Sequence, residues 1–249
     1  VAKGPGLIGS LLVGIHFAKG VAFALQKPLV GINHIEAHLF AAMMSANTNL
    51  QNHFPALGMV LSGGHTSLIQ INDIGSYKLL GQTIDDAIGE AFDKVAKMLQ
   101  LPYPGGPHVE KLALQGNPNS IPFKKSKIKE RPLDFSFSGL KTQVLYRLKD
   151  NRDLPADIAA SFQKTVFDEI VEKLTLALQS NPARALFFGG GVTQNKALRQ
   201  CIQNAFSLPT FWPEKGLCLD NAAMIAGLGF SKQPAAALAD VQPETKIPF

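Results

Sequence analysis

The stretch LGMVLSGGHTSLIQI, residues 57–71, contains two apolar runs that meet at a pair of glycines. Runs rich in Val, Ile and Leu on either side of a Gly-Gly turn are typical of a β-hairpin. A further apolar run at residues 185–188 ends in three glycines and precedes a predicted helix that starts near Asn195. Along the whole chain, predicted strands alternate with predicted helices. This alternation indicates an α/β protein with ligand loops at strand ends.

The composition excludes several classes of protein. With 46% hydrophobic and 17% charged residues among 249, the chain is neither disordered nor of low complexity. Two cysteines are too few for a disulfide framework and favour a reducing compartment. The net charge of +5 permits a polyanionic partner without requiring one. Because Lys19 interrupts the apolar residues 6–25, we expect a buried helix there and no membrane partner.

The predicted elements follow from apolar periodicity and turn residues. We expect helices at residues 7–26, 85–99, through most of 138–180, and starting near Asn33, Asn195 and Asp220. We expect strands at residues 29–32, 57–61, 66–71, 77–81, 185–188 and 210–212, and an irregular segment at 102–138. Asp85, Asp86 and Glu90 are expected in a first helical turn, where acids complement the helix dipole. Asp93 lies two turns in, so it is the better ligand candidate.

His34 and His38 are four residues apart on a predicted helix, so both imidazoles face the same way. This spacing suits one metal ion, although two histidines satisfied by the protein or by solvent remain an alternative. In the zinc-protease signature a glutamate directly follows the first histidine. Here Glu36 lies two residues on, roughly 200° around the helix. It should point away from a metal, and the protease interpretation then lacks its general base.

Two glycine loops and one basic run are open to two interpretations each. The turn at residues 62–66 (SGGHT) and the loop at 189–195 (GGGVTQN) can offer backbone N–H groups to a phosphate, or can be purely structural. Neither is a Walker motif. The basic run consists of Lys124, Lys125, Lys127, Lys129 and Arg131, opposed only by Glu130. Such runs are usually solvated, and contact with a phosphate backbone is the alternative.

Taken together, these segments resemble the TsaD/Gcp/OSGEP family of tRNA threonylcarbamoyltransferases, and the wording is similar to its bacterial branch. The likeness covers nearly the whole chain in order. It is carried by GPGLIGSL at residues 4–11, HIEAH at 34–38, LSGGHT at 61–66, IDDAIGEAFDK at 84–94, YPGGP at 103–107, DFSFSGLKT at 134–142, GGGV at 189–192 with Asn195, and DNAAMIA at 220–226.

The resemblance implies a two-lobed α/β fold of the actin/Hsp70/sugar-kinase type with a nucleotide cleft. It also implies transfer of a threonylcarbamoyl group from threonylcarbamoyl-AMP to N6 of the adenosine beside the anticodon, in tRNAs that read ANN codons. The implied partners are tRNA, a TsaB-like paralogue and a TsaE-like ATPase, in the bacterial cytoplasm. Catalysis would rest on positioning and electrostatics, and no side chain is assigned as nucleophile or general base.

The family's site residues carry over to matching positions of this chain. The divalent metal, Fe²⁺ or Zn²⁺, falls on His34, His38 and Asp220. The adenylate contacts fall on Val60, Leu61, Ser62, Gly63, Gly64, Asp93, Gly106, Glu110 and Asn195. Two positions depart from the family pattern: Glu110 stands where an Asp is usual, and Leu219 stands where a Thr usually precedes the metal Asp.

The resemblance also implies a division of the chain. Residues 1–38 would be the remainder of an N-terminal lobe whose opening strand and loop are expected to be missing. Residues 39–226 would form the C-terminal lobe, with a helical or irregular insertion at about 102–150, and residues 227–249 would pack back on the first lobe. The leading hypothesis is therefore the transferase. A noncatalytic scaffold of the same complex and, less favoured, a zinc metalloprotease are the alternatives.

Overall fold

The structure, a computed structural model, describes residues 1–246. At its centre is a five-stranded mixed sheet with the strand order β5-β4-β3-β6-β7. Strands β3 (Ala56–Leu61), β4 (Thr66–Asp73) and β5 (Ser76–Gln82) form an antiparallel meander. Strands β6 (Leu186–Gly189) and β7 (Thr210–Phe211) add in parallel beyond β3. The predicted hairpin is thus confirmed, with Leu61 opposite Thr66 at its turn.

Both faces of the sheet are buried, because side chains alternate between them along each strand. Leu57, Met59 and Leu61 of β3 belong to the core on one face, whereas Val60 belongs to the core on the other. Helix α2 (His34–Met44) covers the second face, where Leu39 packs. A Cβ at Gly58 would come within 2.9 Å of the Leu39 side chain, so glycine lets α2 approach closely.

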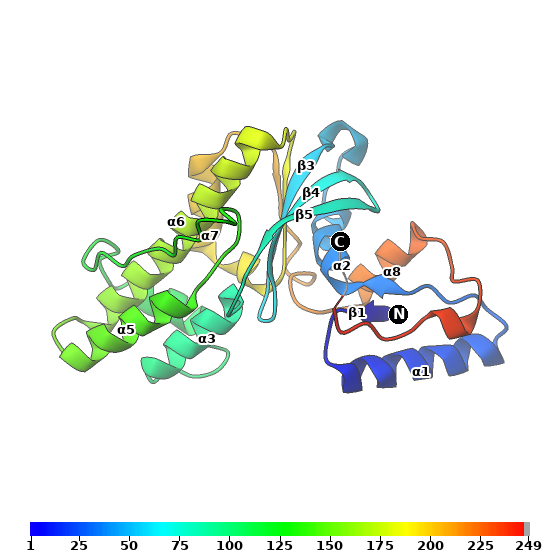
Figure 1. The fold of residues 1–249 in the computed structure, drawn as a ribbon, viewed down its shortest axis with the longest axis horizontal. Helices are drawn as coiled ribbons and strands as arrows, with labels where there is room; N and C mark the ends of the chain where they lie inside the picture. The colour runs from blue at the N-terminus through cyan, green and yellow to red at the C-terminus, as the bar shows by residue number, and fades with distance from the viewer. Residues whose placement is uncertain (247–249) are drawn as a thin grey trace.

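The first face is covered by a helical layer, seen on the left in Figure 1. Its core holds Phe92, Phe162 and Phe188, each at most 2% exposed. The layer consists of α3 (Ile88–Met98), α4 (Gly105–Ala113), α5 (Ser138–Asp150), α6 (Pro155–Ser180) and α7 (Lys196–Ala205). Short 3₁₀ turns occur at Leu50–His53, Gly191–Gln194 and Leu238–Asp240.

A smaller unit lies beyond α2, on the right in Figure 1. Strands β1 (Ala2–Gly4) and β2 (Ile32–Asn33) pair in parallel across α1 (Ile8–Ala24). Helix α8 (Ala222–Phe230) packs on α2 through Met224 and Leu228. The end of the described chain returns to this unit, where Val241 contacts the core side of α1 and Glu244 pairs with Lys3 at 2.7 Å. The proposed division near residues 38 and 226 stays a prediction.

Four expectations were wrong in detail. Helix α1 was expected to be buried, but only Leu11, Ile15 and Ala22 are buried, because the rest of its apolar surface has no covering element within residues 1–246. The third helix begins at Ile88 rather than at residue 85, because the Asp85 carboxylate accepts a hydrogen bond from Phe137 N at 2.9 Å. Asp85 and Asp86 therefore do not lie in a first helical turn. The segment 102–138, expected to be irregular, contains α4, which begins with Gly-Gly-Pro. These residues signal a turn in the sequence. They are nevertheless compatible with the first turn of a helix, because the backbone N–H groups there have no partner within the helix and proline has none to lose. The strand expected at residues 29–32 is shifted to Ile32–Asn33.

Among residues 1–246, no helix combines the length and apolar character needed to cross a membrane.

Candidate metal centre and nucleotide cleft

The structure brings His34, His38 and Asp220 together from two distant parts of the chain. One ligand atom from each residue lies within 4.8 Å of the others. The Asp220 carboxylate is 3.5 Å from His34 Nε2 and 3.2 Å from His38 Nε2. Asn33 starts α2 by accepting hydrogen bonds from Ile35 N and Glu36 N, which places both histidines in the first two turns. Asp220 lies just before α8, which Asn221 caps.

The three residues fit a divalent metal chemically. His38 is 1% exposed; its Nε2 faces the Asp220 carboxylate, and within the described part of the chain its Nδ1 has no hydrogen-bond partner. A buried ring nitrogen without a partner is costly unless something else satisfies it. Two imidazoles and one carboxylate are ligands that zinc and ferrous iron accept, and they leave coordination positions open. Close contact with His34 and then His38 holds the pKa of the Asp220 carboxyl well below its usual range.

The glycine turn lies in the same cavity as the metal residues. A cavity of about 410 Å³ is lined by His34, Asp220 and the turn residues Ser62, Gly63 and Gly64. The turn is held by its own hydrogen bonds, with Ser62 Oγ accepting from His65 N at 3.0 Å. A Cβ at Gly63 or Gly64 would meet no atom within 4 Å, so the turn faces open space. Val60 and Leu61 are fully buried, which leaves only their backbone for contact with a ligand.

The second glycine loop packs against both the turn and the metal residues. A Cβ at Gly189 would lie 2.3 Å from the His38 carbonyl oxygen, and one at Gly190 would lie 2.4 Å from that of Leu61. Gly190 also has a φ of 94°, a conformation that favours glycine. A Cβ at Gly191 would lie 2.9 Å from the side chain of Leu219, the residue that departs from the family pattern. The glycines therefore let the end of β6 approach the end of β3, helix α2 and the segment before α8.

The other predicted adenylate contacts gather at the junction of α3, α4 and α7. Asp93 Oδ1 accepts a hydrogen bond from Gly105 N at 2.7 Å, and Glu110 Oε1 accepts one from Lys196 N at 2.7 Å. Asn195 caps α7 by accepting from Leu198 N at 3.0 Å. A Cβ at Gly106 would meet no atom within 4 Å. Three of these four residues thus have structural partners, and their contact with a nucleotide stays a prediction.

The sequence reasoning assigned no role to His65, which the structure places in the cavity. Its ring lies 6.4 Å from that of His34. Burial, and then the charges of His34 and His38, lower the pKa of His65 to about 4, so the imidazole is neutral near pH 7. The signal for this residue was its position directly after Gly63 and Gly64. Pro5 and Gly6, which precede α1, and Ser10 within α1 line the same cavity.

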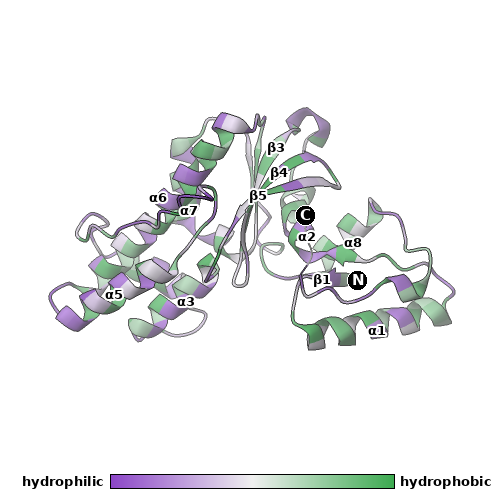
Figure 2. Cartoon of the chain, viewed as in Figure 1, coloured by the Kyte–Doolittle hydropathy of each residue, from purple (hydrophilic) through white to green (hydrophobic). Residues whose placement is uncertain are grey.

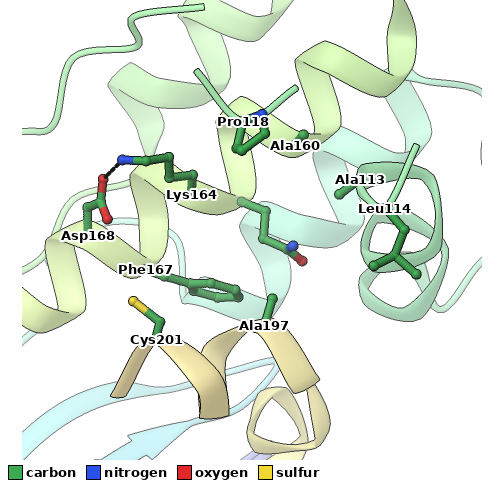
Figure 3. A pocket seen from close by; sticks show the side chains of 10 residues that line it. Ala113, Leu114, Pro118, Ala160, Lys164, Phe167, Asp168, Ala197 and Cys201 are labelled. Atoms are coloured by element: carbon green, nitrogen blue, oxygen red, sulfur yellow. Dashed lines mark hydrogen bonds and ion pairs between the residues drawn. The ribbon is translucent and has the colours of Figure 1, made fainter. Parts of the chain in front are cut away.

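A second, mostly apolar cavity of about 280 Å³ lies between α4, α6 and α7. Figure 3 shows Ala113, Leu114 and Ala197 around it, with the Lys164–Asp168 ion pair at its edge. Gln163 lines this cavity and accepts a hydrogen bond from Asn195 Nδ2 at 2.8 Å. The cavity therefore adjoins the junction described above and is not shared with the metal residues.

Comparison with known proteins decides the family. A family model described as "TsaD: tRNA N6-adenosine threonylcarbamoyltransferase" matches residues 1–227. The chain belongs to the TsaD family. A TsaD relative from Protochlamydia amoebophila, named tRNA N6-adenosine threonylcarbamoyltransferase, is 54% identical; the match covers all of this chain and 76% of the relative. A relative of the same name from Chlamydia pneumoniae is 52% identical over 92% of this chain and 69% of its own length.

Solved structures show the same fold at low sequence identity. The crystal structure of T. kodakarensis HypF has a TM-score of 0.66 and 15% identity; the match covers 87% of this TsaD chain and 39% of HypF. A second HypF structure, described as the phosphate- and nucleotide-bound form, has a TM-score of 0.65 and 13% identity; that match covers 85% of this chain and 37% of HypF. The expected α/β fold of the actin/Hsp70/sugar-kinase type is confirmed.

Proposed function

We propose that this chain transfers the threonylcarbamoyl group of threonylcarbamoyl-AMP to N6 of the adenosine beside the anticodon in tRNAs that read ANN codons. Membership of the TsaD family supports the reaction class. The observation that carries the proposal for this chain is the shared cavity of about 410 Å³, where His34 and Asp220 face the glycine turn. The candidate metal residues and the glycine turn are thereby adjacent, as binding of an acyl-adenylate would require.

His34, His38 and Asp220 would hold Fe²⁺ or Zn²⁺. When bound, such an ion supplies a Lewis acid that stabilises negative charge on carbamoyl and phosphate oxygens. The turn residues Gly63 and Gly64 offer backbone N–H groups to the adenylate phosphate. In the transfer, N6 forms a bond to the carbamoyl carbon and gives up one proton to solvent. The bond from that carbon to the phosphate oxygen breaks, and AMP leaves with the bonding electron pair. The protein contributes by holding the two reactants in line.

The adenylate's nucleoside end would extend toward the junction of α3, α4 and α7. Asn195 and Glu110 lie there, and their present partners are backbone N–H groups and an amide. A nucleotide hydroxyl or amine could donate to these same oxygens without displacing their present partners, because a carboxylate or amide oxygen accepts more than one hydrogen bond. Gly106, with open space at its Cα, would allow close approach.

We further propose that the chain works with a TsaB-like paralogue, a TsaE-like ATPase and tRNA in the bacterial cytoplasm. The exposed apolar face of α1 supports a protein partner, and the exposed lysines of the segment 124–131 support an RNA partner. The protease alternative loses support, because Glu36 pairs with Lys232 instead of facing the histidines.

Reconstitution with the purified partner proteins, tRNA, threonylcarbamoyl-AMP and ATP tests the proposal. We expect modified adenosine from the unaltered chain and a loss on the order of 100-fold or more for His34→Ala. His53→Ala is the matched control, because His53 precedes β3 at the opposite end from the cavity and packs on Phe211. If the unaltered chain forms no modified adenosine, the transferase proposal is wrong for this chain and the noncatalytic scaffold is favoured instead. Equal product from His34→Ala would refute the metal assignment.

A further inference from the structure

Glu36 is a buried carboxylate on the helix that carries the two candidate metal histidines. It is only 5% exposed, and its Oε1 lies 2.6 Å from Lys232 Nζ. Tyr77 from β5 interacts with the Glu36 carboxylate. Burial, and then the charge of Glu36, raise the pKa of the Tyr77 hydroxyl. Glu36 therefore joins three elements, α2, β5 and the segment after α8, and it points away from Asp220, as its spacing predicts.

The partner of Glu36 lies at the other end of the helix that follows Asp220. Asp220 precedes the first residue of α8 by two positions, and Lys232 follows its last residue by two. Between these ends, Met224 and Leu228 pack on α2. Apolar packing is non-directional, so by itself it defines the position of α8 along α2 only loosely. An ion pair at one end, between the buried Glu36 carboxylate and the partly exposed Lys232, defines this position more strictly.

Asp220 depends on this definition. Its side chain is 78% exposed and it lies outside any helix or strand, so few contacts of its own hold it near His34 and His38. A shift of α8 along α2 would carry Asp220 with it.

We propose that Glu36, through its ion pair with Lys232, is a positioning residue that holds α8 in register on α2 and so keeps Asp220 within ligand distance of His34 and His38. The inference rests on the proposed metal site. It gives the glutamate of the HIEAH motif a role without contact to substrate or metal. Because a charge left unpaired in the interior is strongly unfavourable, loss of either partner should displace the other and with it α8.

The test measures Co²⁺ binding to the whole chain, by titration calorimetry and by the visible absorption of the bound ion. We expect Glu36→Gln and Lys232→Gln each to weaken Co²⁺ binding by on the order of tenfold, the lower end for groups that orient ligands. Their absorption spectra should change, because the ligand geometry changes. The double variant should lose no more Co²⁺ affinity than the single variant that binds Co²⁺ less tightly. Lys232→Arg keeps the ion pair and should bind Co²⁺ as tightly as the unaltered chain does.

The ion pair of Lys3 with Glu244, also at 2.7 Å, provides the matched control. Lys3→Gln and Glu244→Gln remove a pair from the same part of the molecule and should leave Co²⁺ affinity unchanged. Thermal unfolding of every variant separates stability from geometry. If Glu36→Gln and Lys232→Gln unfold at lower temperature yet keep the affinity and spectrum of the unaltered chain, Glu36 is merely structural and the proposal is wrong.

His34→Ala separates the two proposals. If the unaltered chain binds no Co²⁺, or if His34→Ala binds it equally well, the metal site itself fails. If His34→Ala loses binding while the Glu36 and Lys232 variants keep it, the positioning role alone fails.

Discussion

At Gly89 the backbone of α3 lies directly against the glycine turn of the cavity. Gly89 N donates to Ser62 O at 3.1 Å, and an added Cβ would come within 2.8 Å of Gly63 Cα. Backbone atoms on both sides leave no flexible side chain to move aside. The second residue of α3 is therefore a glycine for steric reasons. A larger side chain at this position would push the glycine turn away from α3.

We expect Gly89→Ala to displace the turn and to lower transferase activity in the reconstituted system by about tenfold or more, since a small misplacement in a site that works by positioning is costly. Gly139→Ala is a matched control: Gly139 is likewise the second residue of a helix, α5, and its Cβ would meet no atom within 4 Å. That variant should keep full activity and be more stable by up to about 1 kcal/mol. Equal activity of both variants would contradict the role of Gly89.

Helix α6 carries a buried glutamate under the segment that leads to α5. Glu169 is 2% exposed, and burial raises its pKa from 4.5 to about 7. The charge of Lys173 opposes this shift but does not cancel it. Between pH 4.5 and 7 the folded chain thus holds a proton that the unfolded chain has lost. Stability therefore falls as pH rises through this window, and ionised Glu169 costs the folded state on the order of 3 kcal/mol above it.

We expect Glu169→Gln to remove this fall, so that the free energy of unfolding from urea titrations at pH 5 and pH 8 differs less than in the unaltered chain. Glu172→Gln is the contrast. Contact with Lys125 lowers the pKa of Glu172, so this exposed group stabilises the folded state above pH 4.5 and loses its effect as pH falls. If Glu169→Gln shows the same pH dependence as the unaltered chain, Glu169 is ionised at little cost.

Helix α1 exposes an apolar face that the described chain does not cover. Val13, Phe17 and Phe23 are each at least 74% exposed, and Figure 2 shows the helix as predominantly hydrophobic. Apolar surface of this extent marks an interaction site.

We expect Phe17→Asp to abolish co-elution with the TsaB-like paralogue in size-exclusion chromatography. Leu154→Asp, at a leucine 67% exposed at the start of α6, should leave co-elution intact. Retained co-elution of Phe17→Asp would place the partner elsewhere.

Over the whole molecule, the sequence predicted what local patterns control and missed what distant contacts decide. The order of strands and helices and the fold class followed from apolar runs and glycine turns. Asp85 was misplaced because its partner, Phe137, lies 52 residues away. Helix α4 was missed because Gly105 and Gly106 are poor helix formers, and its start depends on the Asp93 side chain. The spacing of His34 and His38 indicated a possible metal pair by itself. The family resemblance was needed to join Asp220 to it, because Asp220 lies 182 residues beyond His38.

The basic segment that precedes α5 is the surface we expect to contact tRNA. Hydrogen bonds between Lys124 and Gln143 hold its backbone, and Lys173 Nζ donates to Pro132 O at 2.6 Å. Lys125 pairs with Glu172 and Arg131 with Asp134. Among the residues that the structure describes, Lys124, Lys127 and Lys129 are left without an ion pair. Exposed cations on a fixed backbone are suited to phosphates.

Replacement of Lys124, Lys127 and Lys129 by Gln should weaken tRNA binding and make it less dependent on salt. Each lysine that contacts a phosphate contributes roughly 0.7 to 0.9 to the slope of log affinity against log salt, so the triple variant should lower that slope by about 2. Fluorescence anisotropy of labelled tRNA between 50 and 300 mM salt measures it. Gln at Lys27, Lys78 and Lys149 removes the same charge from exposed positions elsewhere and should leave the slope nearly unchanged. Equal slopes for the two triple variants would show that only net charge matters, because a specific contact surface must distinguish them.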